Sequence, residues 1–168
     1  PYGLAKSLTY QVFRYRALRA GLTLGKFVIA NPFGPLEEPR FTAYLMKSWF
    51  AGQVPTVNTP VYVRDNIHIS LLAKAYVQFA KQLRERSGLH ALRPSGYVES
   101  QGAFAQRFAA EMRQRLDMPC ELELKRQTEF NEARVRINTD QIDGAPFGWD
   151  EESAWDAIAN YYAHMYRQ

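Results

Sequence analysis

The spacing of apolar residues changes repeatedly along the chain, from helical to strand-like and back, and this alternation restricts the possible folds. Residues 2–19 carry apolar side chains near helical spacing, and Gly21 follows as a stop. Residues 24–31 (LGKFVIAN) contain an unbroken apolar run, which predicts a buried strand ended by Asn31 and Pro32. A long helix followed by a buried strand is typical of an α/β fold.

The alternation continues through the middle of the chain. After a loop with three prolines, residues 40–52 have helical character. Residues 53–68 are extended in character, with several β-branched positions. Residues 69–86 form an amphipathic helical pattern whose last turn is basic, the charge that a helix C-terminus favours. We therefore expect an α/β protein.

The last third shows the same pattern more weakly. Residues 89–100 give a short apolar strand signal that a Pro-Ser-Gly turn interrupts, and Ser100 can cap a helix over residues 102–116. Residues 120–127 alternate apolar and charged side chains, which favours a half-exposed strand. Asp150 can cap a last, aromatic-rich helix.

Size and composition limit the possible classes of protein. A chain of 168 residues, 46% of them hydrophobic, can bury one ordinary core, so we expect a single unit over 1–168. Its 21 basic and 17 acidic residues are interspersed, which favours a solvated surface over a nucleic-acid-binding patch.

Cys120 is the only cysteine, so an internal disulfide and a cysteine metal cluster are excluded, and a cytoplasmic setting is expected. No apolar run approaches the ~20 residues that cross a bilayer, so no membrane partner is expected. Because Pro1 is not an initiator methionine, we expect the printed chain to begin inside a longer product or after processing.

The first six residues, PYGLAK, place a phenol and an ammonium group together. Tyr2 and Lys6 are four apart in a helical pattern, so their side chains share one face. The ammonium can then favour the ionised form of the phenol, which can exchange a proton at an alcohol carbon while a hydride moves. Taken alone, this spacing also occurs by chance in many helices.

Three blocks, PYGLAK, NPFGP and YVRDNIHISLLAKAY, occur in an order and at separations that resemble the extended short-chain dehydrogenase/reductase superfamily. Within it, the nearest likeness is to the NAD-dependent epimerase/dehydratase family, which acts on nucleotide sugars. The resemblance implies the C-terminal part of a Rossmann-type doubly wound sheet (1–35) followed by a small α/β substrate-binding domain (36–168). Such enzymes open with a glycine-rich phosphate loop, whereas Gly21, Gly25 and Gly34 have neither its spacing nor its setting. The sequence looks like the C-terminal half of such an enzyme, cut just before the catalytic tyrosine.

The resemblance also implies roles for the first block. Tyr2 would be the acid/base, and Lys6 would bind the nicotinamide ribose and lower the pKa of Tyr2. The parent protein would use NAD or NADP. This chain alone is expected to bind neither and to be inactive without its missing N-terminal Rossmann half. A nucleotide-diphosphate sugar is the implied substrate, and a homodimer is the expected assembly.

The second and third blocks, with the start of the helix after the second block, supply four candidate substrate-binding residues. By resemblance, Asn31 would contact the substrate and Arg40 would lie near the nucleotide. The ring of Phe33 could pack against a ring of the ligand. Arg64 lies in an extended stretch just before a helix, where a guanidinium can hold a diphosphate with paired, charge-assisted hydrogen bonds. His68 is interpreted as a structural residue at the junction of strand and helix.

Other positions match the family pattern less closely. Asn66 replaces an aromatic residue, and Ser70 stands where an acidic residue is common. Arg134 and Arg136 share one face of an expected strand, in a region where basic residues of the family often reach the nucleotide phosphates. Trp149 resembles a closing segment of the family in which the indole packs.

A second class of function stays open. The chain could be a non-catalytic module that binds a sugar nucleotide or a protein and that kept the substrate lobe after losing catalysis. A reading frame that continues upstream into a glycine-rich loop would favour the enzyme, whereas a start codon at this boundary would favour the module. The choice among epimerase, dehydratase and reductase, and the base and sugar of the nucleotide, are left open by these residues.

Overall fold

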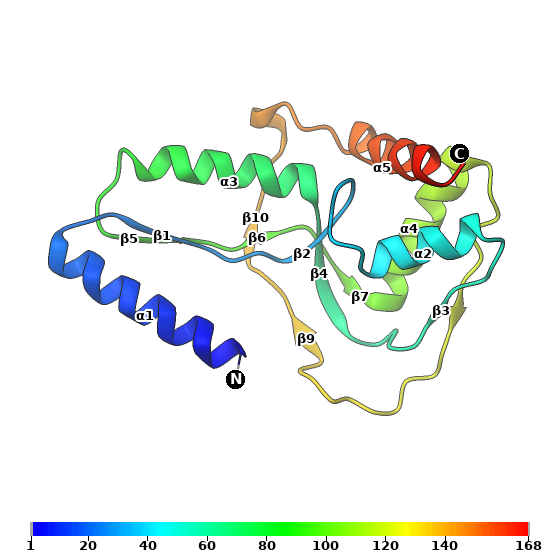
Figure 1. Ribbon diagram of the computed structural model, residues 1–168, viewed down its shortest axis with the longest axis horizontal. Helices are drawn as coiled ribbons and strands as arrows, with labels where there is room; N and C mark the ends of the chain where they lie inside the picture. Colours follow the sequence, from blue (N-terminus) through cyan, green and yellow to red (C-terminus); the bar gives the residue numbers. More distant parts are fainter. Residues whose placement is uncertain (1, 168) are drawn as a thin grey trace.

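The structure is a computed structural model that describes residues 2–167. It is elongated, with α1, α3, β1 and β5 at one end and α2, α4 and α5 packed together at the other (Figure 1). The helices are α1 (Tyr2–Ala20), α2 (Phe41–Phe50), α3 (Ile69–Leu83), α4 (Gln101–Leu116) and α5 (Glu151–Tyr166), with a 3-10 helix at Ala145–Phe147. The strands are β1 (Leu24–Phe27), β2 (Asn31–Phe33), β3 (Thr56–Val57), β4 (Val63–His68), β5 (Leu89–Leu92), β6 (Pro94–Ser95), β7 (Tyr97–Ser100), β8 (Glu123–Leu124), β9 (Val135–Arg136) and β10 (Asp140–Gln141).

The predicted helices are confirmed, and so are two predicted caps. The hydroxyl of Ser100 accepts the backbone N–H of Ala103 at 3.1 Å, which starts α4. The carboxylate of Asp150 accepts the backbone N–H of Ser153 at 2.8 Å, which starts α5. Each cap satisfies a backbone donor that the first turn of a helix leaves without an intrahelical partner.

The strands pair mainly in parallel, as an α/β fold requires. β1 is parallel to β5, and β2 and β9 are each parallel to β4, while β7 is antiparallel to β4. The short pairs β3–β8 and β6–β10 are also parallel. Parallel neighbours need a crossover connection, and the one between β2 and β4 contains α2 and β3. The expected fold class, a mixed α/β protein, is confirmed.

The main core lies between the sheet β2–β4–β7 and the helices α2, α4 and α5. Aromatic side chains dominate it. The ring of Phe33 on β2 lies 5.1 Å from that of Phe104 and 5.4 Å from that of Trp155, measured between centroids. A smaller cluster around Ile67 and Leu71 packs where α3 meets the sheet. α4 packs against β4 and β7, and Trp155 of α5 packs against Phe33 of β2, so these helices cover the sheet.

The predicted buried strand over residues 24–31 is wrong in its extent and its burial. The structure has β1 at Leu24–Phe27 and starts β2 at Asn31, and the side chain of Ile29 between them is 64% exposed. One face of β1 packs on α3, where the rings of Phe27 and Phe79 lie 6.0 Å apart. Within residues 2–167, β5 is the only strand paired with β1, and the apolar run beyond β1 is therefore only partly covered. The strand expected over residues 120–127 is likewise reduced to the two residues of β8.

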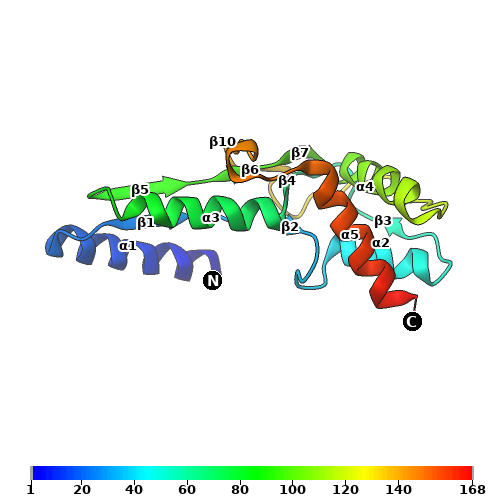
Figure 2. The same ribbon diagram turned by 90° about the horizontal axis from the view of Figure 1, so that it is seen from above.

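The first helix is confirmed as a helix, but it buries almost none of its apolar residues. α1 and α3 lie on opposite sides of β1 and β5 in Figure 1, and the N-terminal end of α1 points toward the middle of the molecule in Figures 1 and 2. Ala17 is its one buried residue. Its exposed large apolar side chains are Tyr2, Leu4, Leu8, Val12, Phe13, Tyr15 and Leu18. None of the helices in the described part is long and apolar enough to cross a membrane.

Candidate functional site

A cavity of about 350 Å³ opens beside β2 and β4, and the four residues predicted to bind substrate all line it. Asn31 and Phe33 come from β2, Arg40 from the residue before α2, and Arg64 from β4. The start of α4 and the segment 132–136 close the other sides. Segments far apart in the sequence therefore meet at one hollow.

Strand register explains how β2 and β4 supply residues to the same cavity. Asn31 lies opposite Asn66 in the parallel pair β2–β4. Side chains of a strand alternate between its faces, so Arg64 and Asn66 point to one side of β4, and both line the cavity. Gly34 follows β2 with a φ of +133°, and a Cβ there would lie 2.9 Å from the side chain of Ile69. The turn that leaves β2 and forms the cavity wall therefore requires glycine.

Phe33 has a different environment from the one expected. Its side chain is 2% exposed and belongs to the aromatic core, where it also lies edge-on to His68 at 5.4 Å between ring centroids. Its faces are already occupied by protein side chains, so the ring supports the cavity floor. The expected stacking of Phe33 on a ligand ring gains no support from this geometry.

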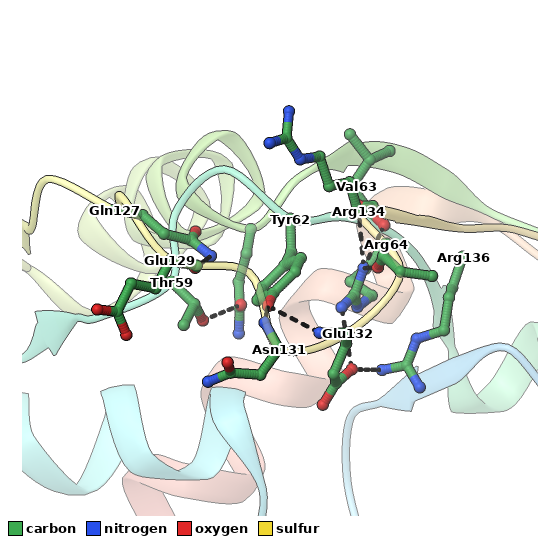
Figure 3. A network of polar contacts seen from close by, with 12 residues as sticks. Thr59, Tyr62, Val63, Arg64, Gln127, Glu129, Asn131, Glu132, Arg134 and Arg136 are labelled. Atoms are coloured by element: carbon green, nitrogen blue, oxygen red, sulfur yellow. Dashed lines mark hydrogen bonds and ion pairs between the residues drawn. The ribbon is translucent and has the colours of Figure 1, made fainter.

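Arg64 is buried, and its guanidinium is used inside the protein (Figure 3). Nη1 donates to the backbone oxygens of Val63, Ala133 and Arg134, at 2.8, 3.2 and 3.2 Å. Nη2 donates to the carboxylate of Glu132 at 3.2 Å. Burial and the neighbouring guanidinium of Arg136 lower the pKa of Arg64 from its ordinary value. The sequence predicted a guanidinium that holds a diphosphate, and in the structure its donors fix residues 132–134 against β4.

Glu132 links two arginines at the edge of the cavity. Its carboxylate contacts Nη2 of Arg64 and, at 2.8 Å, Nη2 of Arg136 (Figure 3). The side chain of Arg136 is 60% exposed and lines the cavity, so this guanidinium has donors left for a ligand. Arg134 instead lies over the ring of Phe130 at 4.0 Å and is not one of the cavity-lining residues.

The loop before α2 brings further charges to the cavity. Arg40 occupies the N-cap position without capping the helix by its side chain, and its guanidinium contacts Glu38 at 2.7 Å. The neighbouring Glu37 is half-buried and lines the cavity. Burial raises the pKa of Glu37 to about 7, although the charge of Arg40 opposes this shift. Glu37 therefore changes charge near neutral pH.

The N-terminus of α2 also faces the cavity. Phe41 and Thr42 form its first turn and line the hollow, and this turn contains no acidic residue. The free N–H groups and positive dipole end of a helix favour a bound anion. The side chain of Thr42 is almost fully buried and its hydroxyl lies beside the phenol of Tyr162, without a hydrogen bond of normal geometry in the described part of the chain. The cavity thus combines anion-binding donors with polar groups that have spare capacity.

A second hollow of about 350 Å³ adjoins the first one. Both are lined by Asn31, Arg64 and Arg136, and the second extends past Ile29 toward Asn138. The backbone N–H of Asn138 donates to the buried carboxylate of Asp65 at 2.9 Å, which holds this edge in place. A ligand longer than one hollow can therefore extend from the α2 end toward the end of β1.

Tyr2 and Lys6 share a face of α1, as predicted, but they do not line either hollow. The ammonium of Lys6 lies 5.4 Å from the ring centroid of Tyr2, and the side chain of Tyr2 is 76% exposed. The structure brings the four predicted substrate residues together and leaves the predicted catalytic pair separate from them.

His68 has the structural role that the sequence indicated. Its Nδ1 accepts the backbone N–H of Ser70 at 3.1 Å, and its Nε2 lies 3.0 Å from the carbonyl oxygen of Ala154. The hydroxyl of Ser70 bridges this imidazole to the indole N–H of Trp149. Burial lowers the pKa of His68, which favours the neutral imidazole. Trp149 therefore packs and bonds at the junction of strand and helix, as expected.

Sequence reasoning missed Glu37, Thr42 and Glu132. The run of two glutamates after the glycine turn was a weak local signal for the first. The other two face the cavity only because of tertiary contacts. Within residues 2–167, no group of three or more His, Cys, Asp or Glu side chains is arranged to hold a metal ion.

The fold resembles part of several solved structures. No protein-family model matches the chain, and no curated protein does. Among solved structures, UDP-N-acetylglucosamine 4-epimerase from Methanobrevibacter ruminantium in complex with UDP-N-acetylmuramic acid matches 98% of this chain and 54% of its own, with a TM-score of 0.70 and 14% identity.

Two other epimerases match similarly. UDP-glucose 4-epimerase from Stenotrophomonas maltophila with bound NAD and formylated UDP-arabinopyranose has a TM-score of 0.68 and 20% identity, over 99% of this chain and 56% of that one. UDP-glucose 4-epimerase with UDP-glucose from Thermotoga maritima has a TM-score of 0.66 and 17% identity, over 98% and 54%. The chain thus spans about half the length of the structures that it matches. At these identities the likeness establishes the fold, which is the one that the three sequence blocks predicted.

Proposed function

We propose that this chain is the substrate-binding, C-terminal part of an enzyme of the NAD-dependent epimerase/dehydratase type and that its cavity binds a nucleotide-diphosphate sugar. Residues 1–35 would complete a Rossmann part, and residues 36–168 would form mainly the substrate lobe. The observation that carries the proposal is the meeting of Asn31, Arg40 and Arg64 at one cavity that three arginines and a helix N-terminus surround. Solved structures of the same fold contain UDP-sugars, which supports this ligand class.

The residues of the chain would divide the work. Arg40, Arg136 and the N–H groups at the start of α2 would contact the diphosphate, because these residues line the cavity and carry hydrogen-bond donors. Arg64 would act indirectly, by holding Glu132 and its neighbours in place. Asn31 lies where the two hollows join, so its amide can donate to or accept from the sugar.

The catalytic half of the proposal rests on Tyr2 and Lys6. A bound NAD would accept a hydride when a sugar carbon is transiently oxidised. The described residues contain no glycine-rich cradle for a pyrophosphate, so they could contact only part of such a cofactor. Gly25, for example, lies within β1 against the side chain of Leu83. We therefore infer that activity needs a separate Rossmann part. The exposed apolar side chains of α1 support a covering partner, which could be that part or, in a homodimer, a second copy.

A non-catalytic binding module is the second candidate. It is favoured by the separation of Tyr2 from both hollows and by the high exposure of its side chain. A cytoplasmic setting, which the lone Cys120 led us to expect, is compatible with either proposal.

Calorimetric titration with UDP-glucose tests the shared binding claim. We expect saturable binding that Arg136→Ala weakens by about 1–3 kcal/mol, the scale of a charge-assisted hydrogen bond. Arg16→Ala, an exposed residue of α1, is the matched control and should change nothing. Binding that is absent, or equally strong in Arg136→Ala, would refute the assignment of the cavity.

Titration with NADH, followed by its fluorescence, tests the inferred need for a separate Rossmann part. This chain should show no saturable micromolar binding. Reconstituted with its Rossmann part, Tyr2→Phe should keep UDP-glucose affinity and lose turnover, because the proton donor is removed. Turnover that survives Tyr2→Phe would remove the catalytic role, and a parent protein without turnover would favour the binding module.

A further inference from the structure

We propose that Glu37 is a ligand-contacting residue of the cavity that acts in its protonated form, so that the site takes up a proton when it binds a diphosphate ligand. This inference rests on the proposed function and adds a specificity-determining residue to it. It concerns a side chain on the loop between β2 and α2 that the sequence did not single out.

The position of Glu37 is the first argument. Its carboxyl lines the same cavity as Arg40, Arg64 and Arg136, yet none of the ion pairs formed by these arginines includes it. Arg40 contacts Glu38, and the other two contact Glu132. Glu37 is therefore a half-buried carboxyl in a proposed anion site, without a direct cationic partner within residues 2–167.

The groups around Glu37 determine its charge. On its own loop, the backbone of Gly34 and the guanidinium of Arg40 favour the carboxylate, while Glu38 disfavours it. From α5, the buried phenol of Tyr162 faces it, and the pKa of that phenol is raised to about 12, so it stays neutral near pH 7. Burial outweighs the favourable contacts and raises the pKa of Glu37 to about 7.

An anionic ligand would shift this balance further. The two negative charges of a diphosphate diester in the same cavity repel a carboxylate, so they raise the pKa of Glu37 again. A protonated carboxyl, in contrast, donates a hydrogen bond to a phosphate oxygen. Binding and protonation should therefore favour each other.

Proton uptake can be measured directly with UDP-glucose, whose diphosphate diester does not titrate between pH 6 and pH 8. Titration calorimetry at pH 7 in PIPES and in Tris, which differ in ionisation enthalpy, should report uptake of about half a proton per ligand, since a group with a pKa near 7 starts half protonated. The Kd should rise by up to about tenfold from pH 6 to pH 8.

Two variants assign the effect to its residue. Glu37→Gln should bind without proton uptake and with a Kd that no longer depends on pH in this range. Glu38→Gln, the neighbouring carboxylate that does not line the cavity, should keep both effects. Circular dichroism checks that each variant is folded, and an absence of uptake by the unmodified chain refutes the role of Glu37 even if a variant does not fold.

The outcomes separate the two proposals. UDP-glucose binding with no proton uptake, or uptake that survives Glu37→Gln, would overturn the role of Glu37 and leave the proposed function standing. No binding of UDP-glucose at pH 6, 7 or 8 would overturn the proposed function and this inference with it.

Discussion

Arg64→Lys tests whether the buried guanidinium holds the structure together around the cavity. Lysine keeps the positive charge but replaces a planar fork with a single ammonium group. In the structure, Nη1 alone serves three backbone oxygens and Nη2 serves the carboxylate of Glu132. The single ammonium nitrogen of lysine cannot reach all four oxygens, which the arginine contacts from two nitrogens.

The expected loss of stability follows from these contacts. The oxygen of Arg134 also accepts the backbone N–H of Val63, so it keeps a partner in the variant. We expect about two of the remaining hydrogen bonds to be lost, each worth about 1 kcal/mol net, which gives a destabilisation of about 2 kcal/mol. The contact between the guanidinium and the ring of Tyr62, at 4.4 Å, would weaken as well.

Urea unfolding followed by tryptophan fluorescence measures this difference. Arg136→Lys is the matched control, since Arg136 pairs with the same Glu132 but its side chain is 60% exposed. An exposed pair contributes about 1 kcal/mol at most, so this variant should unfold close to the parent. If Arg64→Lys is as stable as Arg136→Lys, the structural role assigned to the buried guanidinium is wrong.

Two further predictions concern stability at single positions. The pKa of His68 is lowered below its ordinary value of 6.5 by burial, so the stability that the neutral imidazole contributes should be lost as the pH drops from 6.5 toward the folded-state pKa. Burial raises the pKa of Glu37 to about 7, which changes stability in the opposite direction over this range, so the contribution of His68 is measured as the difference in melting temperature between the parent and His68→Gln. This difference should shrink between pH 7 and pH 5, and a constant difference would contradict the reasoning. Gly96→Ala should destabilise the protein by about 2 kcal/mol or more, because its Cβ would lie 2.4 Å from the backbone oxygen of Asn66. Gly3→Ala, which meets nothing within 4 Å, should instead stabilise α1 by up to about 1 kcal/mol, and equal unfolding midpoints for the two variants would refute the packing argument.

The elements of this protein were predictable because the signals for them are local. Helices α2 to α5 follow from apolar spacing of three to four residues, and the caps at Ser100 and Asp150 act on backbone groups three residues away. The turn at Gly34 follows from the need for a positive φ. The sequence blocks also identified Asn31 and Arg64, and the start of the next helix identified Arg40; the structure brings all three to one cavity.

Burial and pairing were decided by contacts between distant segments. Nothing near Arg64 in the sequence indicates that residues 132–134, about seventy positions later, take up its donors. The exposure of Ile29 depends on which strands pair beside β1, and the pKa of Glu37 depends on how the loop folds over the cavity. A short stretch of sequence specifies the local structure that an apolar run can form and the contacts that a charged side chain can make. The solvent exposure and the partners of these residues follow from strand register and helix packing, which depend on segments far apart in the sequence.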